Sequence, residues 1–243
     1  IFYLRDEDNG WIWTPTARPI RLADSSYIAH HGQGYSSFRS GAYGIASELE
    51  LFVSWNDPVK VSRLRLTNHT SVTRKISVTA YVEWVLGTVR GTNSPFIVTQ
   101  RDEDTGALFA RNPWNADFGE HVAFADFAGR QTAWTCDRTE FLGRNGSFHN
   151  PAALLRGVKL SARTGAGFDP CAALQTSVEL LPDQQVELVF FLGQSDTAES
   201  ARSLLQRLRA TDVGQILDEA KNNWGKLLTT VQVRTPDAAM NIL

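Results

Sequence analysis

The stretch VKVSRLRLTNHTSVTRKISVTAYVEWV, residues 59–85, decides the fold class of this chain. Residues 59–68 and 74–85 alternate apolar and polar side chains for most of their length, which is typical of strands with one buried face and one wet face. Between them, residues 68–71 read Asn-His-Thr-Ser, a composition that favours a turn. The stretch therefore predicts two long antiparallel strands joined as a hairpin.

Strand patterns also fill most of the other residues before position 195. The run at 185–192 is almost continuously apolar, which favours a central strand. Because no amphipathic helix separates the strands, the pattern favours an antiparallel sandwich over a βαβ fold. We therefore expect an all-β domain over residues 1–194, with further strands at 47–55, 107–110, 121–125, 130–135 and 175–180.

The pattern changes from strand to helix at position 195. Asp196 or Thr197 can cap a first helix and Asp212 can start a second, and apolar residues recur at helical spacing after each. We expect residues 195–234 to form a helical linker, whose last residues, 229–234, are extended. Residues 235–243 open with Thr-Pro-Asp, which is typical of a helix start. They predict the beginning of a second, helical domain of a longer protein.

The composition excludes several classes of partner. Of the 243 residues, 42% are apolar and 21% are charged, which is normal for a globular domain. The net charge of -2 favours neither nucleic acid nor an anionic membrane as a partner. We find no apolar run near the roughly 18 residues that span a bilayer, and no secretory leader. We therefore expect this part of the protein to be soluble and cytoplasmic.

Cysteine and tryptophan usage give two further expectations. Cys136 and Cys171 form neither a metal motif nor a disulfide framework, which favours a reducing compartment. The chain also has seven tryptophans, and we expect most of them in the core.

Residues 24–41, DSSYIAHHGQGYSSFRSG, contain many groups that could do chemistry. The Gly-Gln-Gly at 32–34 lacks the third glycine and the Lys-Ser/Thr of phosphate loops. His30 and His31 are adjacent, so in a strand they point to opposite faces and cannot easily share a metal ion. The Gly-x-Ser-x-Gly elbow of serine hydrolases is absent from the sequence. We therefore interpret the glycines as turn residues between strands.

Two acidic clusters have the residues for acid–base chemistry. Residues 5–8, Arg-Asp-Glu-Asp, could offer an acid and base pair, but a solvated turn before a strand at 11–13 is favoured. Residues 101–106 are interpreted by the same reasoning as a hairpin turn.

A third candidate is the segment 141–151, which is long, rich in glycine and asparagine, and aromatic, with Arg138 nearby. It fits a binding loop and a plain connector equally well.

Six short motifs follow one another along the chain. They are Gly10-Trp11-x-Trp13-Thr14-Pro15, Tyr27-x-x-His30-x-Gly32-x-Gly34-Tyr35, Glu48-Leu49-x-x-Phe52-Val53, Leu66-x-Asn68-x-Thr70 with Arg74, Tyr81-x-Glu83-Trp84, and Phe141-Leu142-Gly143-Arg144. In this order they resemble the N-terminal β-supersandwich domain of the inverting disaccharide phosphorylases of glycoside hydrolase family 94. Residues 5–10 and 235–241 favour one branch, the phosphorylase-like region of bacterial cyclic β-1,2-glucan synthetases. The resemblance covers almost the whole chain.

The resemblance implies a large two-sheet antiparallel supersandwich of the galactose-mutarotase-like kind. A helical linker and an (α/α)6 barrel would follow it. In this family the catalytic aspartate lies in the barrel, so the resemblance assigns no catalytic residue to this chain. It implies no cofactor and no metal; inorganic phosphate is the co-substrate and attacks the anomeric carbon with inversion.

The resemblance also implies a binding role for part of the segment 138–151. In related phosphorylases a loop of this domain reaches the catalytic pocket of the partner subunit. We expect Arg144, Asn145, Phe148 and His149 to contribute to a sugar or phosphate subsite. Arginine suits a phosphate oxyanion and phenylalanine the apolar face of a sugar ring. The implied partners are a β-glucan or gluco-oligosaccharide, the chain's own (α/α)6 catalytic domain and a second copy in a homodimer, with no nucleic acid.

Two other functions stay open from the sequence. One is a stand-alone carbohydrate-binding module, and the other is a mutarotase-like epimerase, whose carboxylate and histidine pair the spacing does not identify. The synthetases that the chain resembles are inner-membrane proteins, which would place this region on the cytoplasmic side.

Overall fold

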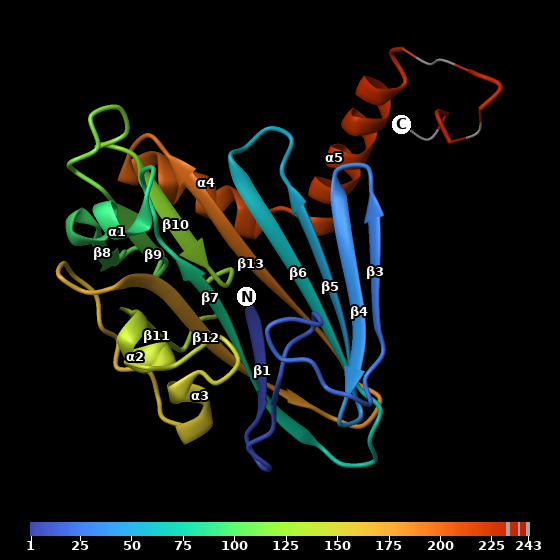
Figure 1. Ribbon diagram of the computed structural model, residues 1–243, viewed down its shortest axis with the longest axis horizontal. Helices are drawn as coiled ribbons and strands as arrows, with labels where there is room; N and C mark the ends of the chain where they lie inside the picture. Colours follow the sequence, from blue (N-terminus) through green and yellow to red (C-terminus); the bar gives the residue numbers. More distant parts are fainter. Residues whose placement is uncertain (232–233, 238, 242–243) are drawn as a thin grey trace.

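A computed structural model describes residues 1–231, 234–237 and 239–241 of the protein. The described part is mostly β, with two antiparallel sheets and a helical C-terminal part, so the all-β expectation is confirmed (Figure 1). The smaller sheet has the order β11 (Ala133–Asp137), β12 (Pro170–Leu180), β7 (Arg74–Glu83), β1 (Phe2–Asp6) and β2 (Ile12–Trp13). The larger sheet has the order β3 (Tyr27–Gly32), β4 (Tyr35–Ala42), β5 (Ile45–Val53), β6 (Val59–Asn68), β13 (Gln185–Ser195), β10 (Val122–Asp126), β9 (Leu108–Arg111) and β8 (Val98–Arg101).

The hairpin predicted from residues 59–85 is wrong, although both of its strands exist. β6 pairs with β5 and β13 in the larger sheet, whereas β7 pairs with β1 and β12 in the smaller one. The side chain of Asn68 donates to the carbonyls of Val72 and Leu180, at 2.8 and 2.9 Å, and so directs the chain toward β12. Alternation reports which face of a strand is buried but not which strand lies beside it, so the sequence pattern could not reveal this crossing.

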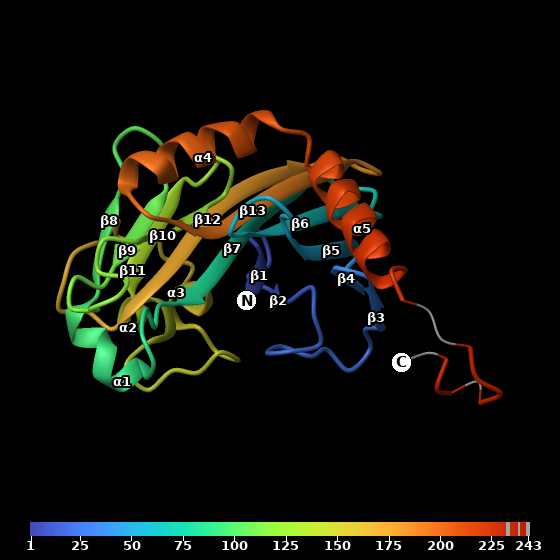
Figure 2. The same cartoon turned by 90° about the horizontal axis from the view of Figure 1, so that it is seen from above.

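The two sheets and the helices form four layers with a core between each pair. Side chains such as Leu4, Leu64 and Leu174 fill the space between the sheets. α4 (Ala198–Ala210) and α5 (Val213–Leu228) cover the outer face of the larger sheet. Figure 2 shows this sheet as an arch, with both helices outside it and the smaller sheet within.

The outer face of the smaller sheet is covered by two short helices. They are α2 (Arg138–Leu142) and α3 (Ala152–Arg156), which pack on side chains such as Tyr3 and Tyr81. Two further short helical segments, α1 (Arg90–Asn93) and the 3-10 turn Ser94–Phe96, follow β7. β13 lies in the middle of its sheet, as its apolar run predicts.

Both predicted helix caps at the C-terminal end are confirmed. The Thr197 hydroxyl accepts a hydrogen bond from the Ser200 amide at 3.1 Å, and the Asp212 carboxylate accepts one from the Gln215 amide at 3.1 Å. The expected link 229–234 and domain start 235–243 include residues 232, 233, 238, 242 and 243, which lie outside the described residues. Within the described ranges, no helix is long and apolar enough to cross a membrane.

Of the glycines in residues 24–41, Gly34 is a turn residue between strands, as expected, and its turn also supports α5. Gly32 ends β3 and Gly41 lies within β4. Gln33 and Gly34 connect β3 to β4, and Gly34 has a φ of +79°. A Cβ at Gly34 would lie 2.2 Å from Cδ1 of Trp224, because the indole ring rests directly on this turn. Lys221, one helical turn earlier, lies 4.2 Å from the centre of the Tyr35 ring. The β3–β4 turn therefore packs against α5 through Trp224 and Lys221.

Two other expectations need correction. The acidic cluster at 5–8 spans the end of β1 and the turn that follows it. Asp6 is fully buried and paired with Arg74, so this part of the cluster is not solvated. Nor are most tryptophans in the core. Trp13 and Trp84 are buried and Trp134 is half-buried, whereas four others are exposed: Trp11, Trp55, Trp114 and Trp224. Such rings keep a large apolar face available to a ligand or a partner.

Candidate functional site

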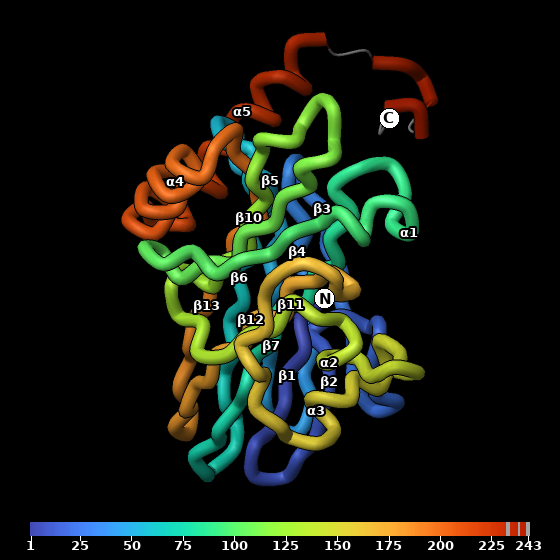
Figure 3. The backbone as a smooth tube through the Cα atoms, turned by 90° about the vertical axis from the view of Figure 1, so that its left-hand side faces the viewer, coloured from blue at the N-terminus to red at the C-terminus, as the bar shows by residue number. Residues whose placement is uncertain are grey.

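The predicted binding segment, residues 138–151, lies against the outer face of the smaller sheet (Figure 3). Its first part is the helix α2 and not a loop, because the Asp137 carboxylate accepts a hydrogen bond from the Thr139 amide at 2.8 Å and caps it. The chain then turns through Gly143 to Pro151 and enters α3. The structure places all four predicted contact residues in this turn, and all four are exposed: Arg144, Asn145, Phe148 and His149.

Two buried tyrosines hold this turn in place. The Tyr3 hydroxyl donates to the carbonyl of Phe148 at 2.9 Å. The Tyr81 ring stacks on Phe141, with centroids 4.9 Å apart, and lies 6.0 Å from the Phe148 ring. Burial raises the pKa of both hydroxyls well above the ordinary value, so both stay protonated and can donate. The backbone of the turn is therefore anchored.

The polar side chains of the turn are not anchored. Among the described residues, the side chains of Arg144, Asn145 and His149 have no hydrogen-bond partner. Phe148 keeps 37% of its surface exposed, so its ring is positioned but not covered.

Beside the turn, four charged side chains form a network that joins four segments. Glu83 ends β7, Arg90 begins α1, Arg138 begins α2 and Asp169 precedes β12. Arg138 Nε donates to Glu83 at 2.8 Å and Arg138 Nη1 lies 3.7 Å from Asp169, while Arg90 contacts both carboxylates. Burial alone would lower the pKa of Arg138, but Glu83 and the other neighbours raise it overall, so this arginine stays charged. Both arginines of the network are thus already paired.

The same end of the sandwich carries a hollow beside exposed aromatic rings. It has a volume of about 470 Å³. At its edge, Phe118 meets His121 edge-on at 5.2 Å, and nearby Trp114 lies 4.9 Å from Phe96. Trp114 is 77% exposed. The residues that line the hollow are Leu86, Gly87, Thr88, Asn112, Asn115, Asp117, Phe118, His121, Ala123 and Gln194.

The chemistry of this hollow suits a polyhydroxylated ligand. Amide and carboxylate side chains can bind hydroxyl groups, and exposed aromatic rings can cover the apolar face of a sugar. The Asn112 side chain donates to the carbonyl of Leu86 at 2.8 Å and so ties the two loops together. His121 Nδ1 is buried and has no hydrogen-bond partner in the part of the chain that the structure describes. In the same part, no three His, Cys, Asp or Glu side chains gather as a metal site would require.

This hollow was not predicted from the sequence. Its signal was residues 112–119, Asn-Pro-Trp-Asn-Ala-Asp-Phe-Gly, a turn-rich segment with two aromatic residues. The other lining loop, residues 86–88, has only Gly87 as a turn signal.

Residues 1–211 match the family described as "Glycosyl hydrolase 94, supersandwich domain". The chain belongs to this family. It is 36% identical over 239 residues to the cyclic beta-(1,2)-glucan synthase NdvB of Rhizobium meliloti, a match that covers 98% of this chain and 8% of that protein. It is 29% identical over 244 residues to the solabiose phosphorylase of Paenibacillus borealis, covering 98% of this chain and 31% of that enzyme. The glycosyl hydrolase 94 domain thus spans only part of the relatives it matches.

Solved structures confirm the fold of this glycosyl hydrolase 94 domain. A bacterial glucoamylase complexed with acarbose superposes with a TM-score of 0.63 at 7% identity, covering 94% of this chain and 31% of that one. A putative kojibiose phosphorylase from the human microbiome gives a TM-score of 0.54 at 5% identity, covering 92% and 27%. At such low identities the likeness concerns the fold alone. The family resemblance and the supersandwich fold expected from the sequence are both confirmed.

Proposed function

We propose that this chain is the non-catalytic supersandwich domain of a β-glucan phosphorylase or cyclic β-1,2-glucan synthase. The observation that carries the proposal is the 36% identity to the Rhizobium meliloti synthase along 98% of this chain. In this proposal residues 1–194 are the sandwich, 195–234 are the linker, and 235–243 begin an (α/α)6 catalytic domain. The domain packs on that barrel, on the cytoplasmic side of the membrane, and a second copy in a homodimer is a further partner.

The proposed role in catalysis is to line a carbohydrate and phosphate pocket. Arg144 supports this role because its guanidinium is exposed and has no partner among the described residues, unlike Arg138 and Arg90. A free guanidinium on an anchored backbone can donate two parallel hydrogen bonds to a phosphate. Phe148 adds an exposed ring, and the Tyr3 hydroxyl fixes the backbone carbonyl of this residue. Asn145 and His149 supply polar groups for sugar hydroxyls.

The test is phosphorolysis by the full-length enzyme, with inorganic phosphate and β-1,2-gluco-oligosaccharides as substrates. Arg144→Ala should lower kcat/KM for phosphate about tenfold or more, because a charge-assisted hydrogen bond is lost. The matched control is Arg156→Ala, which removes an exposed arginine from the last turn of α3 in the same layer. Equal kinetics for the two variants would contradict the assignment of Arg144.

A further inference from the structure

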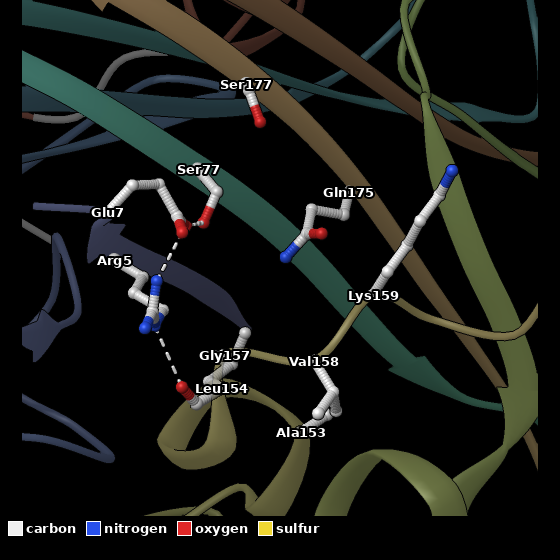
Figure 4. Close-up of a pocket in the computed structure, with 10 residues that line it drawn as sticks. All are labelled: Arg5, Glu7, Ser77, Ala153, Leu154, Gly157, Val158, Lys159, Gln175 and Ser177. Atoms are coloured by element: carbon white, nitrogen blue, oxygen red, sulfur yellow. Dashed lines mark hydrogen bonds and ion pairs between the residues drawn. The ribbon is translucent and has the colours of Figure 1, made fainter. Parts of the chain in front are cut away.

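A separate polar pocket lies on the outer face of the smaller sheet, roofed by α3 and the residues after it (Figure 4). Its volume is about 240 Å³. Figure 4 shows Arg5 and Glu7 on one side of the hollow and Gln175 and Lys159 on the other. The complete lining is Arg5, Glu7, Ser77, Ala153, Leu154, Gly157, Val158, Lys159, Gln175 and Ser177.

The Arg5 guanidinium is held rigidly at the edge of this pocket. Its Nε donates to the carbonyl of Leu154 at 2.9 Å, and its Nη1 is paired with Glu7. Glu7 in turn accepts a hydrogen bond from the Ser77 hydroxyl. Only 13% of the Arg5 side chain is exposed, and within the described residues its Nη2 has no hydrogen-bond partner. The pocket thus holds a fixed, unused donor.

Gly157 keeps the space beside this donor open. It ends α3 with a φ of +62°, a conformation that favours glycine. A Cβ at this position would lie 2.6 Å from Arg5 Nη2 and would fill the gap next to the guanidinium.

Other lining groups extend the set of donors and acceptors. Ser177 and Lys159 are exposed, and their side chains have no hydrogen-bond partner in the described ranges. Gln175 Nε2 donates to Thr79 at 3.2 Å, which leaves its carbonyl oxygen available. Val158, which is 51% exposed, supplies an apolar side chain on the α3 side of the pocket.

Charge and size select the ligand class. Arg5 and Glu7 neutralise one another, and Lys159 adds one positive charge on the opposite side of the pocket (Figure 4). A phosphate or carboxylate beside Arg5 would face the Glu7 carboxylate, which disfavours an anion at that position. Hydroxyl groups can accept from Arg5 and donate to Glu7 at the same time. Pockets for drug-sized ligands run from about 300 Å³ upward, so this one suits a single small ring.

We propose that this pocket binds one neutral glucosyl residue, as a site separate from the turn that carries Arg144. The apolar face of the sugar ring packs on Val158, and the sugar hydroxyls bond to the Arg5–Glu7 pair and to Ser177. The choice of glucose rests on the proposed function, which makes a β-glucan the substrate. The site would hold the glucan chain beside the reaction without taking part in it.

The test is a titration of the isotope-labelled chain with methyl β-glucoside, followed by amide shifts in two-dimensional NMR. We expect saturable shifts at Ser77, Gly157 and Ser177. Ser177→Val fills the floor of the pocket and breaks no described hydrogen bond, so it should weaken binding at least tenfold while the protein stays folded. Ser71→Val, the same change at an exposed serine of the crossing turn, should leave binding unchanged.

Three outcomes would overturn the proposal. They are the absence of saturable shifts in the wild-type chain, shifts that survive Ser177→Val, and stronger binding of inorganic phosphate than of the glucoside at the same residues. None of these outcomes alters the kinetic result for Arg144, so failure of this pocket and failure of the proposed function are distinguishable.

Discussion

Replacing Asp6 with asparagine should lower the free energy of unfolding by about 3–5 kcal/mol, because it breaks a buried ion pair at one partner. Asp6 is fully buried and the Arg74 side chain is 7% exposed. One carboxylate oxygen accepts Nε of Arg74 at 2.8 Å and also Nη2, and the other accepts the amides of Asp8 and Asn9, each at 2.9 Å. The asparagine amide can replace the amide-bound oxygen. Its NH2 group would then face the Arg74 guanidinium, and two donors cannot bond to each other. Two charge-assisted hydrogen bonds of about 1.5–3 kcal/mol each are therefore lost.

The effect should depend on pH. Burial alone would raise the pKa of Asp6, but the hydrogen bonds from Arg74 and the two amides lower it overall. A carboxyl group with a lowered pKa in the folded state stabilises the protein above its unfolded pKa, about 3.9 for aspartate, and loses that contribution as the pH falls through the folded value. The stability difference between wild type and Asp6→Asn should therefore be full at pH 7 and shrink below about pH 4.

The assay is urea unfolding followed by circular dichroism at pH 7 and at several acidic values. Asp8→Asn is the matched control, because Asp8 lies in the same turn but is exposed, and it should cost under about 0.5 kcal/mol. A loss below about 1 kcal/mol for Asp6→Asn, or a difference that does not narrow in acid, would refute the reasoning.

Two further predictions concern other positions. Gly34→Ala should lower the free energy of unfolding by about 1–2 kcal/mol because of the φ of +79° at this position, and by a further amount because the new methyl group displaces Trp224. The loss, measured by urea unfolding, should therefore be smaller in a Trp224→Ala background. Equal losses in both backgrounds would exclude the indole contact. Trp114→Ala in the full-length enzyme should reduce kcat/KM for the glucan several-fold, because an exposed ring that can cover a sugar is lost. The free energy of unfolding should hardly change, because the ring is 77% exposed. Unaltered kinetics would exclude the hollow at this end of the sandwich as a sugar contact.

The sequence predicts where the strands of this fold lie better than it predicts which strands pair with one another. Alternation in residues 59–85 identifies β6 and β7 because burial of one face imposes a period of two. It cannot show that five connecting residues carry the chain from one sheet to the other, since that depends on long-range bonds such as the one from Asn68 to the Leu180 carbonyl. The helix caps at Thr197 and Asp212 were predictable because capping is local.

The candidate contact residues also differ in whether local sequence can reveal them. The proposed contacts Arg144 and Phe148 were singled out through the family resemblance, because the composition of their segment indicated only a loop. The pocket at Arg5 could not be predicted, because it needs β1, β7, β12 and α3 to meet, and even the bonded pair Arg5 and Leu154 is 149 residues apart in the chain. Exposed tryptophans were misjudged for a related reason. Composition gives the number of rings but not the layer in which each lies.

The acidic clusters that first suggested catalysis are used to hold the domain together, and this supports a non-catalytic role. A general acid must keep its proton near neutral pH, which requires a raised pKa. Burial acts in that direction on Asp6 and Asp102, but Arg74 lowers the pKa of the first, and Thr105 and Arg202 lower that of the second. Each carboxylate therefore stays ionised and serves as an anchor. Asp6 ties the end of β1 to the start of β7, and Asp102 ties the turn after β8 to α4 through Arg202 at 2.8 Å. Groups that fix the sandwich and its helix in this way are poor proton donors, which agrees with the non-catalytic role proposed for this domain.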